Sequence, residues 1–145
     1  MQTVRQLLDN KKQHAGPIAI APEATVFQAL ELMAEHDIGA VLVMEGKNVV
    51  GIFSERDYAR RIILQGRTST GTPVRDIMTS RVLFVRPENT VDDCMALMSE
   101  KRIRHLPVLD EGGEVCGVLS IGDLVRATIE EQEHVIGQLV QYIHG

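Results

Sequence analysis

Aromatic residues are scarce in this chain of 145 residues, and tryptophan is absent. Aromatics make up only 3% of the sequence, so the chain has few of the flat rings on which single-stranded nucleic acids stack. A net charge of −5 also argues against a surface that binds polyanions. We therefore expect no nucleic-acid partner and, with 44% hydrophobic residues, an ordinary aliphatic core.

Cysteine is also scarce, and long apolar runs are missing. Cys94 and Cys116 lie in apolar runs without CxxC spacing, which predicts two buried thiols and neither a metal site nor a disulfide. No run approaches the roughly 18 apolar residues of a membrane span, and the first residues do not have the pattern of a signal peptide. The sequence predicts a cytoplasmic protein that binds neither a metal nor a membrane.

An internal repeat organises the sequence. A shift of 65 positions aligns the first half with the second, and one extra residue in a Gly-Gly turn moves the offset to 66. The segments that lead into the repeats, 4–8 and 74–78, correspond at an offset of 70. The aligned pairs include Pro22 and Pro87, Thr25 and Thr90, Gly51 and Gly117, Ser54 and Ser120, and Asp57 and Asp123.

Each repeat begins with a short strand and an amphipathic helix. The strands are predicted at 18–20 and 83–85, and apolar residues at i, i+3, i+4 and i+7 mark the helices that follow. Thr25 and Thr90 open these helices with a capping-box pattern or a close variant of it. Both helices are therefore expected to start one residue after these threonines.

A hairpin and a second helix complete each repeat. Ser54 and Ser120 are expected to open the second helices. The sequence thus predicts an α+β fold of two tandem β-α-β-β-α repeats, related by a pseudo-two-fold axis, with a C-terminal helix. The hairpins are predicted from paired apolar runs at 40–44 and 49–53 and at 106–109 and 115–119.

The C-terminal segment carries an apolar stripe at helical spacing, which must be buried on its own unit or on a second copy of the chain. The stripe consists of Ile129, Ile136, Leu139, Val140 and Ile143. The predicted parts of the chain are an N-terminal lead-in helix at 1–15, a first repeat at 16–66, a linker and lead-in to the second repeat at 67–81, a second repeat at 82–127 and a C-terminal amphipathic helix at 128–145.

The motifs at the hairpin exits resemble those of CBS domains, the family named after cystathionine β-synthase. The pattern Gly-h-h-Ser-x-x-Asp, where h is hydrophobic, occurs at 51–57 and 117–123, and Arg-His-Leu-Pro-Val occurs at 104–108. The resemblance runs from residue 4 to residue 126 and implies a stand-alone tandem CBS pair. Proteins of this family bind AMP, ATP, NAD or S-adenosylmethionine in clefts between the repeats, and they usually regulate a neighbouring enzyme or transporter.

The Ser-x-x-Asp motif has two interpretations. Ser54 with Asp57, and Ser120 with Asp123, satisfy the capping-box pattern, and capping alone could explain both. A helix N-terminus with a serine hydroxyl also suits a phosphate, while an aspartate suits the two hydroxyls of a ribose. With the duplicated context and the family resemblance, we expect Asp57 and Asp123 to bind ribose and Ser54 and Ser120 to bind phosphate.

The two repeats differ in the basic residues near these motifs. Arg104 and His105 precede a strand of the second repeat, where the first repeat has Gly39 and Ala40. The resemblance implies that Arg104 and His105 reach the phosphate, and Arg56 is the candidate cation of the first repeat. An ordinary place on the surface is the alternative for these residues.

The resemblance also implies where the adenine ring is held, namely by groups just before the first strand of the opposite repeat. Ile18 is expected at the site of the second repeat, and Met78, Thr79 and Val82 at the site of the first. A core strand position and an ordinary turn explain these residues equally well.

Convergent acid–base groups, an activated nucleophile and a phosphate-binding glycine loop are not evident in the sequence, so we expect no enzyme activity. The sequence predicts a regulatory sensor that binds an adenine nucleotide, AMP first and NAD or ATP otherwise. It is expected to form a homodimer and to signal to another protein in trans. The alternative is a ligand-independent dimeric protein-interaction module, in which Ser-x-x-Asp only caps helices.

Overall fold

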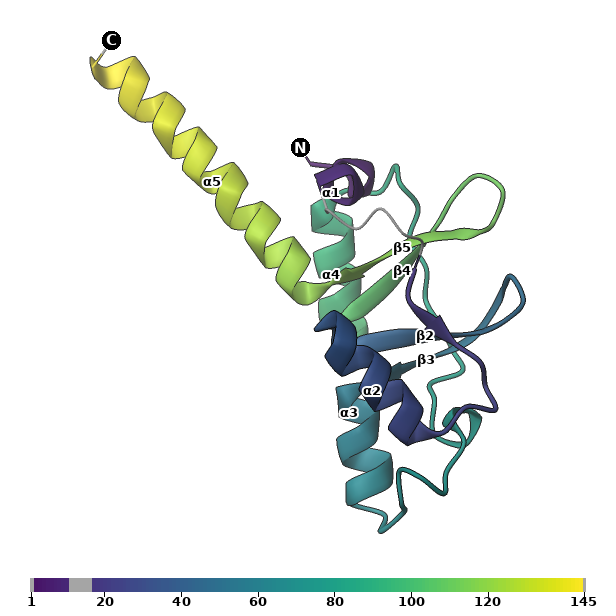
Figure 1. Cartoon of the computed structure of the whole chain (residues 1–145). Helices are drawn as coiled ribbons and strands as arrows, with labels where there is room; N and C mark the ends of the chain where they lie inside the picture. The colour runs from purple at the N-terminus through teal and green to yellow at the C-terminus, as the bar shows by residue number, and fades with distance from the viewer. Residues whose placement is uncertain (1, 11–16, 145) are drawn as a thin grey trace. The chain divides into compact units, whose positions relative to one another are not determined.

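The structure is a computed structural model that describes residues 2–10 and 17–144 (Figure 1). It divides into two compact units. The first-repeat unit is Pro17–Leu83. The second-repeat unit joins the described N-terminal residues to the chain from Phe84 onward. Both units contain helices and an antiparallel hairpin, which confirms the predicted α+β class.

The first-repeat unit contains a three-stranded sheet in the order β1-β2-β3. The strand β1 is parallel to β2, and β2 forms an antiparallel hairpin with β3 that is interrupted by a bulge after Val43. The predicted strand, helix and hairpin are confirmed. The elements are β1 (Ala19–Ile20), α2 (Val26–His36), β2 (Ala40–Glu45), β3 (Asn48–Ser54), α3 (Glu55–Tyr58), the π-helical turn η1 (Ala59–Ile63) and the 3-10 turn η2 (Val74–Asp76).

The second-repeat unit repeats the hairpin, with a bulge after Val108, the position equivalent to Val43. The strand predicted at 83–85 is reduced to a single parallel bridge between Val85 and Val108. Val85 still makes two backbone hydrogen bonds, to Pro107 O and from Leu109 N. The elements are α1 (Val4–Asn10), α4 (Val91–Lys101), β4 (His105–Leu109), β5 (Val115–Ser120) and α5 (Ile121–His144).

The helix α5 is continuous over 24 residues, so the predicted boundary between residues 127 and 128 falls inside it. Its sequence contains no proline that would end the helix after the first turns. Only Leu124 and Ala127 are buried, and every described residue from Ile129 onward is exposed. Within its unit, α5 therefore packs through its first turns alone, and Figure 1 shows the remainder leading away from α4.

Each unit has its own hydrophobic core, which is aliphatic in the second-repeat unit and includes the aromatic ring of Phe53 in the first. Phe53 and Met33 contribute to the core of the first-repeat unit, and Leu119 and Met98 contribute from the equivalent positions in the second. The helices that cover the cores start where predicted, because Thr25 and Thr90 make complete capping boxes with the third helical residue. The two repeats therefore match in the packing of their cores as well as in their sequences.

The two cysteines differ in burial. Cys94 lies in the core of the second-repeat unit, and burial raises the pKa of its thiol to about 11. The prediction that Cys116 is buried was wrong, because Cys116 is exposed. Val108 pairs with Gly117 and Leu109 with Val115, so Cys116 is the extra residue of the bulge in β5 and lies outside the regular alternation of side chains.

The lead-in segments are fixed in both units by the same backbone hydrogen bonds. Val74 N donates to Ala24 O and Arg75 N to Pro22 O in the first-repeat unit. Val4 N donates to Asn89 O and Arg5 N to Pro87 O in the second. A third pair, Val26 N to Thr72 O and Val91 N to Gln2 O, completes each set. The segment before the second repeat in sequence is therefore packed on the first repeat, and residues 2–10 are packed on the second.

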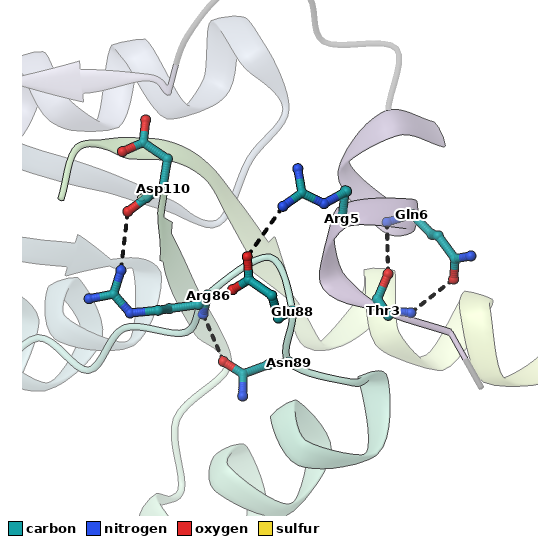
Figure 2. Close-up of polar contacts among 7 residues, drawn as sticks. All are labelled: Thr3, Arg5, Gln6, Arg86, Glu88, Asn89 and Asp110. Carbon is teal, nitrogen blue, oxygen red and sulfur yellow. Dashed lines mark hydrogen bonds and ion pairs between the residues drawn. The ribbon is translucent and has the colours of Figure 1, made fainter. Parts of the chain in front are cut away.

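Polar side chains add to the docking of α1 (Figure 2). Thr3 and Gln6 cap α1 through two hydrogen bonds of 3.0 and 3.3 Å. Arg5 Nη2 contacts Glu88 Oε1 at 3.3 Å, an exposed ion pair that contributes little by itself. The turn that α1 contacts is held by Arg86 N, which donates to Asn89 Oδ1 over 2.8 Å. Backbone bonds, rather than this ion pair, fix the N-terminus.

Two equivalent glycines make room for the lead-ins. A Cβ on Gly51 would lie 2.8 Å from Met78 Cγ and 3.1 Å from Thr79 O. A Cβ on Gly117 would lie 2.6 Å from Leu8 Cδ2. Met78 and Leu8 correspond at the offset of 70. A side chain at either glycine would therefore push the lead-in off the hairpin.

We expect Gly51→Ala to lower the free energy of unfolding by about 1–3 kcal/mol, because overpacking at this contact displaces Met78 and a backbone carbonyl. Urea denaturation followed by circular dichroism measures the change. Gly137→Ala is the control, since a Cβ there meets no atom within 4 Å, and it should leave stability unchanged or raise it by up to about 1 kcal/mol. Equal stability of Gly51→Ala and the unsubstituted chain would contradict the packing argument.

Candidate functional site

The first Ser-x-x-Asp motif lies where β3 passes into α3. Ser54 ends β3 in an extended conformation, and its hydroxyl accepts from Asp57 N over 3.2 Å. The Asp57 carboxylate in turn binds Ser54: its Oδ2 accepts from Ser54 N over 3.0 Å and from Ser54 Oγ over 3.1 Å. The predicted capping box is therefore complete, and it holds a half-buried carboxylate in one orientation.

The lead-in of the first-repeat unit reaches the second oxygen of this carboxylate. Thr79 Oγ1 donates to Asp57 Oδ1 over 3.2 Å. Thr79 is itself fixed to β3, because its N–H and carbonyl both pair with Ile52 at 2.9 Å. Arg61 supports the same segment, since its Nη1 donates to Ile77 O and Met78 O over 2.9 and 3.0 Å. Asp57 and Thr79 thus form one polar cluster within this unit.

The other residues predicted for this site lie in the same unit, at different degrees of exposure. Arg56 is exposed in α3, between the two motif residues. Met78 is half-buried and packs against the unit's core. Val82 is half-buried, and its N–H donates to Ser80 O over 3.1 Å. The structure gives Thr79 a direct contact with the motif, and no such contact is described for Val82.

The second motif repeats this geometry where β5 passes into α5. Asp123 Oδ2 accepts from Ser120 N over 2.8 Å, and Ser120 Oγ accepts from Asp123 N over 3.2 Å. The other oxygen, Oδ1, accepts from Arg126 Nη2 over 2.7 Å. Only 11% of the Asp123 side chain is exposed. Burial of a carboxylate costs free energy unless it is hydrogen-bonded, and these donors offset that cost.

Strand pairing places the predicted cations beside the second motif. His105 is paired in register with Ser120 across the β4–β5 hairpin. The carbonyl of Arg104 accepts from Ile121 N over 2.8 Å at the start of α5. The first-repeat unit has the same two contacts, with Ala40 paired to Ser54 and the carbonyl of Gly39 bound to Glu55 N. The second motif therefore has basic residues where the first has none at these two positions.

One predicted residue, Ile18, belongs to a different unit from the motif that it was expected to serve. Ile18 belongs to the first-repeat unit, where it packs against the core and its carbonyl accepts from Leu42 N over 3.2 Å. Asp123 belongs to the other unit. The expected pairing of Ile18 with the Asp123 site stays a prediction.

Arg126 and Arg61 were not identified from the sequence as residues that contact the candidate sites. Arg126 was detectable, because a cation three residues after an aspartate on a helix is well placed to pair with it. Arg61 was not, since its partners are backbone carbonyls 16 and 17 residues away, to which any residue type could belong. In the described part of the chain, no three His, Cys, Asp or Glu side chains gather as a metal site would require.

The geometry of two repeats, each with a hairpin that ends in Ser-x-x-Asp, agrees with the family comparison. The model of the CBS domain matches residues 13–64 and 74–130. The chain belongs to the CBS domain family. It is 47% identical to a solved CBS-domain protein from Burkholderia ambifaria, with a TM-score of 0.85 over 90% of this chain and 96% of that one. A CBS domain protein from Pyrobaculum aerophilum, solved in complex with AMP, is 26% identical with a TM-score of 0.72, over 83% of this chain and 88% of that one.

Among proteins known by sequence, a mitochondrial CBS domain-containing protein of Arabidopsis thaliana is 44% identical over 126 residues. The match takes in 83% of this chain but only 61% of the Arabidopsis protein, which is therefore the longer of the two. Of the described helices, none is both long enough and apolar enough to cross a membrane.

Loss of either motif serine should destabilise its helix start. We expect Ser54→Ala and Ser120→Ala each to lower the free energy of unfolding by about 1 kcal/mol, because the N–H of the aspartate loses its acceptor. Thr90→Ala removes the equivalent hydroxyl from α4 and should have an effect of the same size. Chemical denaturation of the three variants measures these effects. Serine variants as stable as the unsubstituted chain would show that the caps contribute nothing.

Proposed function

We propose that this CBS pair is a non-catalytic regulatory sensor that binds an adenine nucleotide, with AMP as the first candidate and NAD and ATP as the others. The observation that carries the proposal is the likeness to the Pyrobaculum protein, which was solved with AMP and aligns over 83% of this chain. The nucleotide signal would pass to another protein in trans. A cytoplasmic location also belongs to this proposal, although the Arabidopsis relative is a mitochondrial protein.

The motif aspartates would bind the ribose. A carboxylate accepts hydrogen bonds from two neighbouring hydroxyls, and the capping boxes hold Asp57 and Asp123 in fixed orientations. Each is at least partly buried, so its interaction with a ligand would be less weakened by water than that of an exposed aspartate. Their geometry supports the ribose role better than the sequence pattern alone does.

The phosphate would be bound by the motif serines and the nearby cations. Ser120 with Arg104 and His105 would form this group in the second-repeat unit. In support, His105 pairs with Ser120 across the hairpin, and the backbone of Arg104 is bound to that of Ile121, the residue after Ser120. Ser54 with Arg56 would form it in the first. Because two basic residues lie near Ser120, the Asp123 site is the better candidate for an anionic ligand.

The adenine ring would be held by the residues that precede the strands, as the family resemblance implies. Met78, Thr79 and Val82 would serve the Asp57 site, and the contact between Thr79 and Asp57 supports placing this segment there. Ile18 would serve the Asp123 site. The location of these sites in clefts between the repeats stays a prediction.

The exposed part of α5 supports a second element of the proposal, a homodimer. Its apolar residues follow a spacing of three and four, which is the spacing of helices that pair with each other. Glu130 and Glu131 fall outside this seam, so two copies would bring no like charges together there. The seam consists of Val125, Ile129, Ile136, Leu139 and Ile143, with Gln132 as its one polar position.

A second copy of the chain is the occupant that this seam fits best. Identical helices present the same pattern, so their seams are complementary in register. The 16 residues from Ile129 to His144 are exposed throughout, and a helix of this length is only marginally stable without a partner. The same seam favours the alternative function, a dimeric interaction module that needs no ligand.

The ligand proposal predicts that isothermal titration calorimetry detects binding of AMP at micromolar to millimolar concentration. Asp123→Ala and Asp57→Ala should each abolish one site or weaken it at least tenfold, because the ribose loses a charged acceptor. NAD, ATP and S-adenosylmethionine, titrated in parallel, rank the candidate ligands.

Asp93→Ala is the matched control for these titrations. Asp93 closes the capping box of α4 as Asp57 and Asp123 close theirs, but it belongs to neither motif. It should therefore reproduce any effect of a weakened cap without changing AMP binding. If Asp123→Ala and Asp57→Ala bind AMP as the control does, the motifs only cap helices and the interaction-module alternative is favoured.

The dimer proposal predicts that Ile136→Asp converts a dimer into a monomer of 16.1 kDa, because a charge would be buried in the middle of the seam. Sedimentation equilibrium measures the mass of each variant. Gln141→Asp places the same charge on α5 outside the seam and should leave the dimer intact. A monomeric unsubstituted chain, or a dimer that survives Ile136→Asp, would refute pairing through α5.

A further inference from the structure

Arg126 lies one helical turn after Asp123, and its guanidinium is paired with the Asp123 carboxylate. Nη2 of the arginine is 2.7 Å from Oδ1 of the aspartate. The two side chains differ in exposure, with 68% of the arginine exposed and 11% of the aspartate. The carboxylate is therefore fixed in place, whereas the long side chain of Arg126 has solvent around it into which it can move.

The pairing involves the oxygen that a ligand would need. Asp123 Oδ2 accepts from Ser120 N over 2.8 Å, and this bond holds the start of α5 whether or not a ligand binds. A ribose diol that binds through both carboxylate oxygens uses Oδ1 as well as Oδ2. Arg126 already donates to Oδ1. A ribose hydroxyl that approaches Oδ1 from the side of the guanidinium therefore competes with it.

In the first-repeat unit, the equivalent oxygen of the motif aspartate accepts from a neutral group instead of a cation. Asp57 Oδ1 accepts from the neutral hydroxyl of Thr79 over 3.2 Å. Arg60, the counterpart of Arg126, is exposed and is not paired with Asp57 among the described residues. The counterpart of Thr79 in the second-repeat unit is Asp9, which is exposed in α1. The cation on the motif aspartate is therefore specific to the second repeat.

We propose that Arg126 makes the Asp123 site selective for phosphorylated adenosines, an inference that rests on the proposed function. A nucleoside displaces the guanidinium from Asp123 and offers it no new anion. A nucleotide displaces it and supplies a phosphate, which guanidinium binds strongly through paired hydrogen bonds. Arg126 is thus a specificity-determining residue that disfavours adenosine and favours AMP.

The test compares the binding of AMP and adenosine by calorimetry in an Asp57→Ala background, where only the Asp123 motif is intact. Arg126→Gln should raise the adenosine affinity about two- to fivefold, because an exposed helical ion pair no longer competes. It should weaken AMP binding, so that the ratio of AMP to adenosine affinity falls at least tenfold. Arg126→Lys keeps the charge and should retain most of the ratio.

Arg60→Gln in the same background is the matched control, and it should leave the ratio unchanged. If Arg126→Gln weakens AMP and adenosine by the same factor, Arg126 supports the ribose or the fold and the inference is wrong. AMP binding that disappears in Asp57→Ala alone would place the ligand at the other motif and would also overturn the inference. Failure of the unsubstituted chain to bind AMP, NAD or ATP would instead overturn the proposed function, before any Arg126 variant is compared.

Discussion

The docking of each lead-in onto a repeat is the constraint on which the rest of this structure depends. Three backbone hydrogen bonds fix each lead-in to the turn before the first helix, and a glycine on the hairpin leaves room for its side chain. The first-repeat unit satisfies this constraint with consecutive residues, 17–83. The second-repeat unit recruits residues 2–10 from more than 80 positions away, so this contact costs more loop-closure entropy than its counterpart in the first.

The same constraint makes the two motifs chemically unequal. In the first-repeat unit the lead-in continues as extended chain and brings the Thr79 hydroxyl onto Asp57. In the second, the lead-in is helical as far as Asn10, and its equivalent residue, Asp9, is exposed in α1. Arg126 donates to the aspartate instead. The extended lead-in thus occurs with a neutral partner for Asp57, and the helical lead-in occurs with a cationic partner for Asp123.

Much of the fold could be predicted because its signals are local and occur twice. Caps at Thr25 and Thr90 and both hairpins follow from residues within a few positions of each other. The partner of each lead-in could not be predicted, since the backbone groups that bind it are the same in every sequence. The exposure of Cys116 was mistaken because an apolar run does not reveal where a bulge interrupts the strand. Of the candidate sites, the motif geometry was predictable and the contacts from Thr79 and Arg61 were not.

Capping does not by itself account for the charge on Asp57 and Asp123. Gln28 closes the capping box of α2 with a neutral amide, whose Oε1 accepts from Thr25 N over 3.0 Å, so the cap needs only an acceptor at this position. The bonds of Gln28 are exposed, whereas those of Asp57 and Asp123 are partly buried, where an ionised group costs free energy. The partly buried carboxylates of Asp57 and Asp123 suit the ribose role proposed above, in which each would accept two hydroxyls. Thr79 and Arg126 already donate to one oxygen of each carboxylate.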